Sequence, residues 1–437
     1  MSKTKLSRRQ VLGGLTAAVG FPAVVPASVI GSSTTPAPSE QITLGFIGMG
    51  QQGTGKNLRQ NFLKQADARV LAVCDVDAER CLTAQGIVHE QYGNKDCDAY
   101  NDFREILNRD DIDAVAISTP DHWHAIMSIM AAKAGKDVFC EKPTVSIEEG
   151  RVVSDVIRDT GRVLQTGTED RSLPLYHRMA EMVRNKAIGT LHTIRVGLPC
   201  GKSRPAHLDR GKTYKVPDGF DYDLWLGPAP KAQYNPARCH FNFRYIYDYA
   251  GGILPDWGMH LVDTAQWAND TERTGPVQVE GMGEFPHDGL YDTAYEFFLK
   301  YTYDNGVRMI VRTGKPFLRF EGSEGWIESD GWMKELTASA DDILAWERGL
   351  NDIHLYTNPA GEQRDFLDCV KSRKEPYFPA EIGHRCATVM HIGTHCMQLG
   401  RSLQWDPAKE AYVNDAEAGI PGSLEFGCLR SKIMQAR

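Results

Sequence analysis

The sequence lacks several features that would point to other classes of protein. Its 437 residues contain no C-x-x-C pair, which argues against a zinc ribbon or a dithiol redox motif. The net charge is -8, and no basic stripe interleaved with aromatic residues occurs, so we expect no nucleic-acid partner. No internal repeat and no long apolar run follows the first part of the chain. A chain of this length and ordinary composition is expected to form two domains.

The cysteines are scattered singly along the chain. Their number, 10, is even, and in an exported protein an even number is compatible with disulfides. Several nevertheless fall within expected strands and helices, where a buried free thiol is the simpler interpretation. We therefore expect mostly free thiols.

The N-terminal segment has the features of an export signal. Arg8 and Arg9 form a twin-arginine signature, residues 11–25 are mildly apolar and rich in glycine and alanine, and Ala27 follows small residues at a cleavage-like position. The apolar stretch is shorter than the roughly 20 residues that a membrane span needs, which disfavours an uncleaved anchor. We predict a signal peptide over residues 1–27, a linker over 28–40, and a periplasmic or otherwise exported protein that uses the twin-arginine route and has no membrane partner after cleavage.

Residues 41–167 alternate between short apolar runs and helical patterns. This alternation predicts βαβ units and a parallel sheet, so the first domain is expected to have a Rossmann fold. The expected strands cover residues 42–48, 69–74, 113–118, 137–140 and 162–166, and the expected helices cover residues 54–65, 78–92, 124–134 and 147–159. Ser146 is expected to cap the last of these helices.

A glycine-rich turn follows the first expected strand and opens a helix. Gly48, Gly50 and Gly53 form G-x-G-x-x-G, and Asp75 ends the second expected strand. In this context the pattern predicts a dinucleotide site, with the pyrophosphate at the helix N-terminus. Asp75 would bind the adenosine ribose and repel a 2′-phosphate, so NAD is the expected cofactor. The other residues of this turn that are expected to contact the cofactor are Met49, Gln51 and Gln52.

The second half, residues 168–437, changes character. Strand-like segments are expected at 277–283, 294–303, 306–312, 317–320 and 326–328, and helices at 256–268, 363–371 and 381–399. Asp304-Asn305-Gly306 is a hairpin signal. We predict a substrate-binding and oligomerisation domain of the α/β type, built on an open, mostly antiparallel sheet.

Three short motifs behind the glycine-rich turn resemble one oxidoreductase family. They are Thr-Pro-Asp-His-Trp-His at 119–124, Glu-Lys-Pro at 141–143 and Asp-Trp-Gly-Met-His at 256–260. Their order and spacing resemble the glucose–fructose oxidoreductase/inositol dehydrogenase (Gfo/Idh/MocA) family over residues 41–406. The resemblance implies that Lys142 contacts the reacting hydroxyl, that His260 is the acid/base, and that Asp256 orients it. It also implies a cis bond before Pro143.

The residues agree with the chemistry that this resemblance implies. Oxidation of an alcohol needs a base for the hydroxyl proton and a cation for the developing alkoxide. Lys142 follows a parallel strand, at the edge where such sheets bind ligands. Asp256 and His260 are i and i+4 on an expected helix, although the pair could also be a structural helix start. Asp263, one turn on, is either a second polar ligand or a helix-face residue.

Further cofactor contacts are expected from residues that end the other Rossmann strands. His122 and His124 flank a tryptophan, and no carboxylate or cysteine completes a metal site beside them, so we expect no metal. A loop that lines the nicotinamide is the favoured interpretation. The expected cofactor contacts of this group are Thr119, Pro120, His122, His124, Glu141, Lys142 and Gln165.

A substrate pocket is expected from the aromatic segment 225–252. Arg238, His240, Asn242 and Arg244 alternate with apolar residues, as on one face of an extended segment. Aromatic rings with arginine and asparagine nearby suit a carbohydrate, although the segment could instead cover the domain's own core. The remaining expected substrate contacts are Arg171, Tyr247, Asp256 and His260.

The sequence therefore predicts an NAD-dependent oxidoreductase that acts on a secondary hydroxyl of a sugar or polyol. Two alternatives stay open. One is an NAD-dependent glycosidase or lyase that oxidises its sugar transiently, and the other is a non-catalytic sugar-binding protein. The resemblance further implies a homo-oligomer, dimer or tetramer, that forms through the exposed face of the antiparallel sheet.

Overall fold

The computed structural model of the chain describes residues 36–203, 212 and 214–418. The chain divides into two compact units, residues 1–41 and residues 42–437. In the first unit the described part contains only η1 (Pro38–Glu40), a short 3-10 helix. The predicted signal peptide and most of the predicted linker lie outside the described residues.

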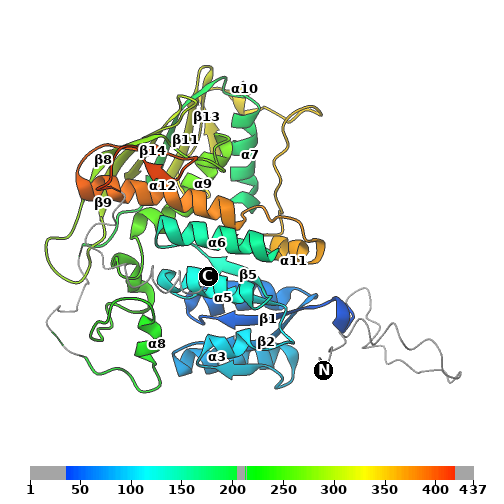
Figure 1. Cartoon of the computed structure of the whole chain (residues 1–437). Helices are drawn as coiled ribbons and strands as arrows, with labels where there is room; N and C mark the ends of the chain where they lie inside the picture. Colours follow the sequence, from blue (N-terminus) through cyan, green and yellow to red (C-terminus); the bar gives the residue numbers. More distant parts are fainter. Residues whose placement is uncertain (1–35, 204–211, 213, 419–437) are drawn as a thin grey trace, which may run out of the picture. The chain divides into compact units, whose positions relative to one another are not determined.

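The second unit begins with a six-stranded parallel sheet (Figure 1). Its order is β3-β2-β1-β4-β5-β6, with every neighbouring pair parallel. This is the strand order of a dinucleotide-binding Rossmann fold, so the predicted fold of the first domain is confirmed. The strands are β1 (Ile42–Ile47), β2 (Ala68–Cys74), β3 (Asp98–Tyr100), β4 (Ala114–Ile117), β5 (Asp137–Glu141) and β6 (Leu164–Gly167).

Helices connect these strands close to the predicted positions. They are η2 (Gln51–Asn61), η3 (Phe62–Lys64), α3 (Ala78–Tyr92), α4 (Phe103–Leu107), η4 (Asp121–Trp123), α5 (His124–Lys133) and α6 (Ile147–Thr160). The side chain of Ser146 accepts a hydrogen bond from the backbone N–H of Glu149, which confirms the predicted cap. The sequence did not predict β3 and α4, which are only three and five residues long.

The second sheet has nine strands in the order β13-β12-β11-β7-β10-β9-β8-β14-β15. All neighbours are antiparallel except β7 and β10, so the predicted open, mostly antiparallel sheet is confirmed. The strands are β7 (Leu191–Leu198), β8 (Gln278–Glu284), β9 (Glu296–Thr302), β10 (Arg308–Thr313), β11 (Phe317–Gly322), β12 (Gly325–Ser329), β13 (Leu336–Ala338), β14 (Leu403–Asp406) and β15 (Ala411–Tyr412).

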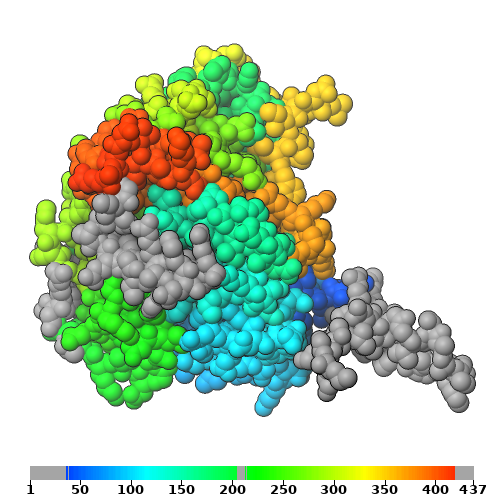
Figure 2. Space-filling view, viewed as in Figure 1, coloured from blue at the N-terminus to red at the C-terminus, as the bar shows by residue number. Residues whose placement is uncertain are grey.

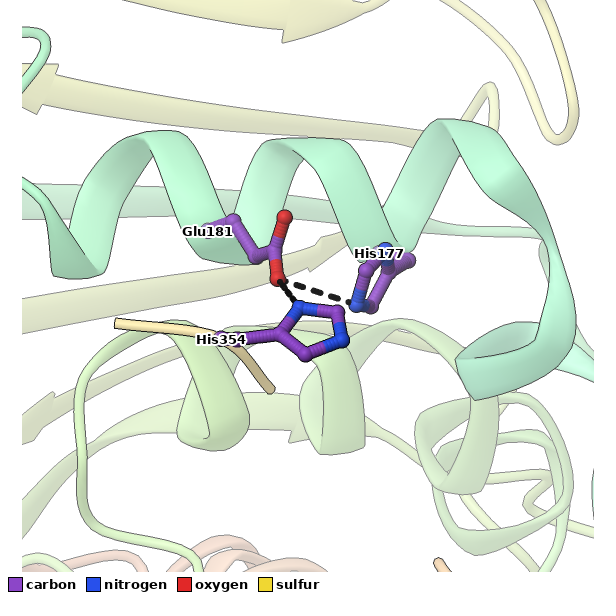
Figure 3. A group of neighbouring side chains, drawn as sticks. All are labelled: His177, Glu181 and His354. Carbon is purple, nitrogen blue, oxygen red and sulfur yellow. Dashed lines mark hydrogen bonds and ion pairs between the residues drawn. The ribbon is translucent and has the colours of Figure 1, made fainter. Parts of the chain in front are cut away.

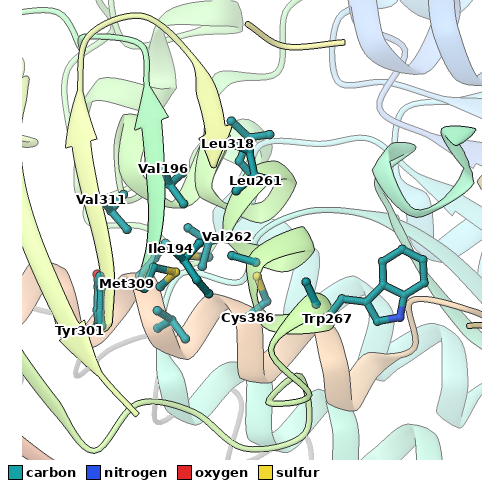
Figure 4. Packing of buried hydrophobic residues seen from close by; sticks show 14 of the residues in the cluster. Ile194, Val196, Leu261, Val262, Trp267, Tyr301, Met309, Val311, Leu318 and Cys386 are labelled. Atoms are coloured by element: carbon teal, nitrogen blue, oxygen red, sulfur yellow. The ribbon is translucent and has the colours of Figure 1, made fainter. Parts of the chain in front are cut away.

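Helices cover one face of this sheet. Apolar side chains of β7 and β10, among them Ile194 and Val311, pack against α9 and α12 (Figure 4). At roughly 25 cal/mol per Å² of buried apolar surface, such packing is the main stabilising contribution of the domain. The helices and short turns of this half are η5 (Asp170–Ser172), α7 (Pro174–Arg184), α8 (Tyr222–Leu226), η6 (His240–Tyr245), α9 (Ile253–Ala268), α10 (Asp341–Leu344), α11 (Glu362–Ser372) and α12 (Ala380–Leu399).

One helix of the second half packs on the first sheet. Phe366, Leu367 and Cys369 of α11 belong to the apolar cluster that contains β1 and β2 residues. In Figure 2 the orange surface of this region borders the teal surface of residues near α6. The second half therefore contributes to the core of the Rossmann domain. The predicted domain boundary at residue 167 does not take this contribution into account.

Nine cysteines lie in the described residues; all are free, and all but Cys200 are buried. The prediction of mostly free thiols is confirmed for these nine, while Cys428 lies outside the described residues.

In the part of the chain that the structure describes, no helix has both the length and the apolar character of a membrane span.

Candidate active site

A cavity of about 750 Å³ opens beside the carboxyl ends of the Rossmann strands. Its wall combines the glycine-rich turn with residues of η6, α9 and the β12–β13 connection. Such a position is where open parallel sheets bind ligands. The predicted site residues that line it are Gly48, Gly50, Gln51, Gln52, Asp75, Thr119, Pro120, His124, Glu141, Lys142, His240, Arg244, Asp256 and His260.

The glycine-rich turn leaves space for a dinucleotide next to its backbone on the cavity side, and is tightly packed elsewhere. A Cβ on Gly53 would lie 2.0 Å from the carbonyl oxygen of Gly48, and Gly48 itself has φ +88°. A Cβ on Gly50 would meet only Arg80, at 3.2 Å, and Gly50 faces the cavity. The turn is thus closed toward the sheet and open toward the cavity, ahead of the N-terminus of η2. This geometry fits a pyrophosphate.

Asp75 joins the turn to the end of β2. Its carboxylate accepts hydrogen bonds from the backbone N–H of Met49, at 2.5 Å, and of Asp77, at 2.8 Å. Burial raises the pKa of Asp75 to about 6, although these two N–H groups lower it. Met49 and Gly53 do not line the cavity; they shape the turn that does.

Lys142 lies just beyond β5 and meets α9 across the cavity wall. Its Nζ donates hydrogen bonds to the backbone oxygen of Asp256 and, at 2.9 Å, to Oδ1 of Asp256. Arg244 approaches Oδ2 of the same carboxylate at 3.3 Å. Burial alone would raise the pKa of Asp256, but the two cations lower it to about 2. The Lys142–Pro143 bond is cis, as the resemblance implied.

His260 has Asp170 as its carboxylate partner, a residue that was not among those predicted from the sequence. Nδ1 of His260 lies 2.5 Å from Oδ2 of Asp170, which follows β6 and is fully buried. Asp256, four residues earlier on α9, instead pairs with Lys142. The i, i+4 expectation is therefore corrected, because packing supplies a carboxylate from another element. Burial lowers the pKa of His260, but the charge of Asp170 raises it, and the net result is a raised pKa.

Asp170 is held by two further donors. Thr168 donates to its Oδ2 at 2.9 Å, and the indole Nε1 of Trp332 donates to its Oδ1 at 3.1 Å. Burial raises the pKa of Asp170 and the charge of His260 lowers it, with a lowered pKa as the net result. Asp170 begins η5, shortly after β6 ends at Gly167, so its place near a parallel strand end is the sequence signal that could have found it. No sequence signal marks Trp332.

Glu169, next to Asp170, completes a group of three side chains that are close enough to hold a metal ion, but Glu169 is already paired with a lysine. Ligand atoms of Glu169, Asp170 and His260 lie within 4.8 Å of one another. Lys56 binds Glu169 at 2.9 Å, and Asp170 has the three donors described above. The charges of this cluster are thus balanced by side chains, and the expectation of no metal stays a prediction.

A second group of this kind joins α7 to the segment between α10 and α11, and none of its members lines the cavity. His177, Glu181 and His354 face one another in Figure 3. The carboxylate of Glu181 accepts from Nδ1 of His354 at 2.7 Å, from Arg348 at 2.8 Å and from the backbone N–H of Leu355 at 3.0 Å. Because Arg348 balances its charge, this group fastens the segment around His354 to α7.

Two residues that were expected at the nicotinamide are buried elsewhere. The His122 ring bonds the carbonyl oxygen of Trp225 at 3.0 Å, and burial lowers its pKa to about 4. Gln165 is fully buried and donates to the carbonyl oxygen of Thr166. Neither lines the cavity, so the structure places both in the packing behind it. His124, which does line the cavity, lies between the carbonyl oxygens of Thr119 and Pro143.

Arg171 was expected to contact substrate and is instead a core residue. It is 2% exposed and forms two hydrogen bonds of 2.7 Å with the carboxylate of Asp263. Glu272 lies at 2.9 Å from the same guanidinium. This buried ion pair joins η5 to α9. Asp263 is thus neither a ligand in the cavity nor an exposed helix-face residue.

The expected extended segment at 238–244 is in fact mostly the 3-10 helix η6. The alternation therefore does not place its side chains on one face, because a 3-10 helix repeats every three residues. His240 and Arg244 line the cavity, whereas Arg238, Asn242 and Tyr247 do not. Arg238 donates instead to the hydroxyl of Tyr249.

Comparison with known proteins agrees with this geometry. Residues 42–168 match the NAD-binding Rossmann fold of an oxidoreductase family, described under the name GFO_IDH_MocA, and residues 203–420 match its C-terminal alpha/beta domain. The chain is similar to the uncharacterized oxidoreductase YrbE of Bacillus subtilis, with 32% identity over 278 residues that cover 62% of this chain and 67% of that protein.

Two further similarities cover different extents. A glycosyl hydrolase family 109 protein of Shewanella sp. (strain ANA-3) is 38% identical over 117 residues, a quarter (25%) of each chain. The crystal structure of aldose-aldose oxidoreductase from Caulobacter crescentus, complexed with glycerol, has a TM-score of 0.62 at 19% identity and covers 83% of this chain and 99% of that one. The fold, the glycine-rich turn and the family match together identify NAD as the cofactor. The chain belongs to the Gfo/Idh/MocA family of NAD-binding oxidoreductases.

Proposed function

We propose that the protein oxidises a secondary hydroxyl group of a sugar or polyol. NAD, when bound, would accept the hydride that leaves the carbon. The observation that carries the proposal is that Lys142 and His260, each held by its own carboxylate, line the same cavity as the glycine-rich turn. The cavity therefore contains a cation and a titratable base next to a dinucleotide site, which is what alcohol oxidation requires.

Lys142 would stabilise the oxygen that loses its proton. Asp256 stays ionised at neutral pH, since its pKa is about 2. It holds the Lys142 ammonium at the cavity wall, where the side chain is only 10% exposed. A fixed ammonium group in a partly dry site stabilises a developing alkoxide more than the same group in water.

His260 would take the hydroxyl proton. Its Nδ1 is bound to Asp170, which leaves Nε2 as the atom that can accept a proton from substrate. Asp170 fixes the ring orientation and stabilises the imidazolium that forms, as the carboxylate does in a nucleophile–histidine–carboxylate triad. The proton thus moves from the hydroxyl oxygen to Nε2.

A redox-assisted glycosidase is the second candidate. It is favoured by the 38% identity to a glycosyl hydrolase family 109 protein, although the match covers only 25% of the chain. In such an enzyme the sugar would transiently give its hydride to NAD, would lose its anomeric substituent by elimination, would add water at the anomeric carbon, and would then take the hydride back from the NADH. The same Lys142 and His260 would serve the first step.

One experiment separates the two candidates. The purified protein with NAD is mixed with a panel of sugars, polyols and aryl glycosides, and both nicotinamide absorbance and products are followed. Net formation of NADH and a keto-sugar supports the oxidoreductase, whereas release of the aglycone without net NADH supports the glycosidase. Neither product from any member of the panel would refute both, provided that the protein binds NAD.

We also propose export through the twin-arginine route, which rests on Arg8 and Arg9 and the apolar stretch that follows. Replacing both arginines with lysine should retain the protein in the cytoplasm in a cell fractionation, while the wild type is found outside it. Equal export of both forms would contradict the proposal.

We propose that the protein is a homo-oligomer that uses the outer face of the nine-stranded sheet. Met282 and Phe298 are cross-strand partners on β8 and β9 and are 72% and 47% exposed. Two large apolar side chains side by side at the surface are typical of an interface. Light scattering should give a dimer or tetramer, and replacing both residues with glutamate should yield monomers; a monomeric wild type would contradict this.

A further inference from the structure

We propose that Trp257 and Trp332 form a stacking corner that selects ring-shaped substrates, pyranoses or cyclitols, over open-chain polyols. We further propose that Trp332 positions Asp170 against His260, so that one side chain serves both recognition and proton transfer. The inference deepens the oxidation proposed above and rests on it, because it narrows a sugar or polyol to a cyclic one.

The corner consists of three rings at the cavity wall. Trp257 and His260 come from α9, and Trp332 comes from the connection between β12 and β13. The ring centroids of Trp257 and Trp332 lie 5.6 Å apart at 72°, and both rings lie within 6.0 Å of the His260 ring. All three residues line the cavity. The rings meet at steep angles, so they form the sides of a corner and do not stack on one another.

The position of Trp332 is fixed by its neighbours. Met333 N–H donates to the hydroxyl of the fully buried Tyr176 at 3.0 Å. The hydroxyl oxygen of Ser329 lies 2.9 Å and 2.8 Å from the carbonyl oxygens of Gly331 and Lys334, to either of which it can donate, and Gly331 has φ +150°. The short connection is therefore built before substrate arrives, and a preformed surface loses little conformational entropy on binding.

A corner of this kind favours a cyclic substrate for a simple reason. A pyranose or cyclitol presents a flat patch of C–H groups that packs on an aromatic face, with its hydroxyl groups pointing outward from the ring. An open-chain polyol has no such patch and would have to be ordered in a bent form. Because His260 is the third side of the corner, a ring seated there has an edge hydroxyl next to Nε2.

Trp332 also acts on the proton acceptor through Asp170. Its indole N–H bonds Oδ1 of Asp170, while His260 bonds Oδ2 of the same carboxylate. The N–H partly offsets the negative charge that His260 experiences. Loss of this donor, with the ring retained, should therefore strengthen the effect of Asp170 on His260 and raise the pKa of His260.

Two substitutions at one position separate the roles. Trp332→Phe keeps an aromatic face but removes the N–H, and Trp332→Leu removes both. Trp326→Leu is the matched control, since Trp326 packs against Arg319 on β11 and does not line the cavity. The probes are methyl glucopyranosides and myo-inositol as cyclic compounds, and sorbitol and mannitol as open-chain compounds.

For the wild type we expect kcat/KM to be at least about tenfold higher for the best cyclic probe than for either open-chain probe. Trp332→Leu should raise KM for that probe about tenfold. Trp332→Phe should leave KM within about threefold, lower kcat and move the acid limb of the pH profile to higher pH. The control should match the wild type, and NAD affinity should be the same in all.

Equal rates on open-chain and cyclic probes, or an unchanged KM in Trp332→Leu, would overturn the stacking corner. An unshifted pH profile in Trp332→Phe would overturn the positioning role. Quenching of tryptophan fluorescence by the cyclic probes measures binding without turnover. If quenching is present in the wild type and lost in Trp332→Leu while no probe is oxidised, the corner stands and the proposed oxidation fails.

Discussion

Replacing Asp170 with asparagine is the most direct test of the proton acceptor. The substitution keeps the side-chain shape but removes the charge that lies 2.5 Å from Nδ1 of His260. Since that charge raises the pKa of His260, its removal should lower this pKa. The neutral imidazole, which accepts the proton during oxidation, then dominates down to a lower pH. The acid limb of kcat/KM against pH should therefore move to lower pH.

The rate should fall even where His260 is neutral. A hydrogen bond to a charged group contributes about 1.5–3 kcal/mol, and Asp170 is fully buried, so water cannot replace it. If this stabilisation is made mainly in the transition state, when the imidazolium forms, its loss corresponds to a decrease in kcat of roughly 10- to 150-fold. An asparagine amide that donates to Nδ1 would also hold the ring in the wrong tautomer, which adds to the loss.

The assay is the initial rate of NADH formation from pH 5 to 10 with the best substrate of the panel. Glu321→Gln is the matched control, because Glu321 pairs with arginines on the sheet strands and does not line the cavity. A profile for Asp170→Asn with the wild-type acid limb, or a kcat within about twofold of the wild type, would refute the assignment of Asp170 to His260.

Three further substitutions test other parts of the structure. Lys142→Ala should lower kcat by about 10²–10⁴-fold while NAD still binds, as measured by turnover and by calorimetry; a near-normal rate would remove its role. Asp75→Ala should weaken NAD binding or relax its preference over NADP, and unchanged titrations would argue against a ribose contact. Asp263→Asn should leave Arg171 with Glu272 as its remaining carboxylate partner among the described residues, destabilise the fold by about 3 kcal/mol and lower the melting temperature by roughly 3–6 °C without a specific change in KM. A large change in KM with an unchanged melting temperature would instead return Arg171 to substrate binding.

Local sequence signals were sufficient for most of the Rossmann domain. Helix α3 occupies the predicted range, Ala78–Tyr92, because Asp77 caps its start and Gly93 ends it in a left-handed conformation. Strand β7, in contrast, was not predicted, although it lies between β10 and β11 in the second sheet. Its partners are more than 100 residues away, as in the pairing of Thr193 with Arg308, so no hairpin turn marks it.

The candidate site, like the fold, could be predicted where its features are local and could not where they depend on packing between distant elements. Most of the predicted residues that follow a strand or belong to the glycine-rich turn line the cavity, because strand ends and turns are local features; Met49, Gly53 and Arg171 do not. The partners of the residues in the cavity wall were not predicted, since they depend on packing between distant elements. Arg171 is an example: its position after β6 is local, but its burial against Asp263 on α9 could not be read from spacing.

His260 is paired with Asp170 and not with Asp256, which binds Lys142, and this pairing has a chemical consequence. Had Asp256 bound His260, as the i, i+4 spacing predicted, Lys142 would either have lacked a counter-ion or have shared one carboxylate with the base. In the structure each group has its own: Asp256 holds Lys142, and Asp170 holds His260. His260 can then change its protonation state without competing with Lys142 for one carboxylate. A single titrating group on the acid limb of the pH profile is the expected signature, and it is the signal that the Asp170 substitution displaces.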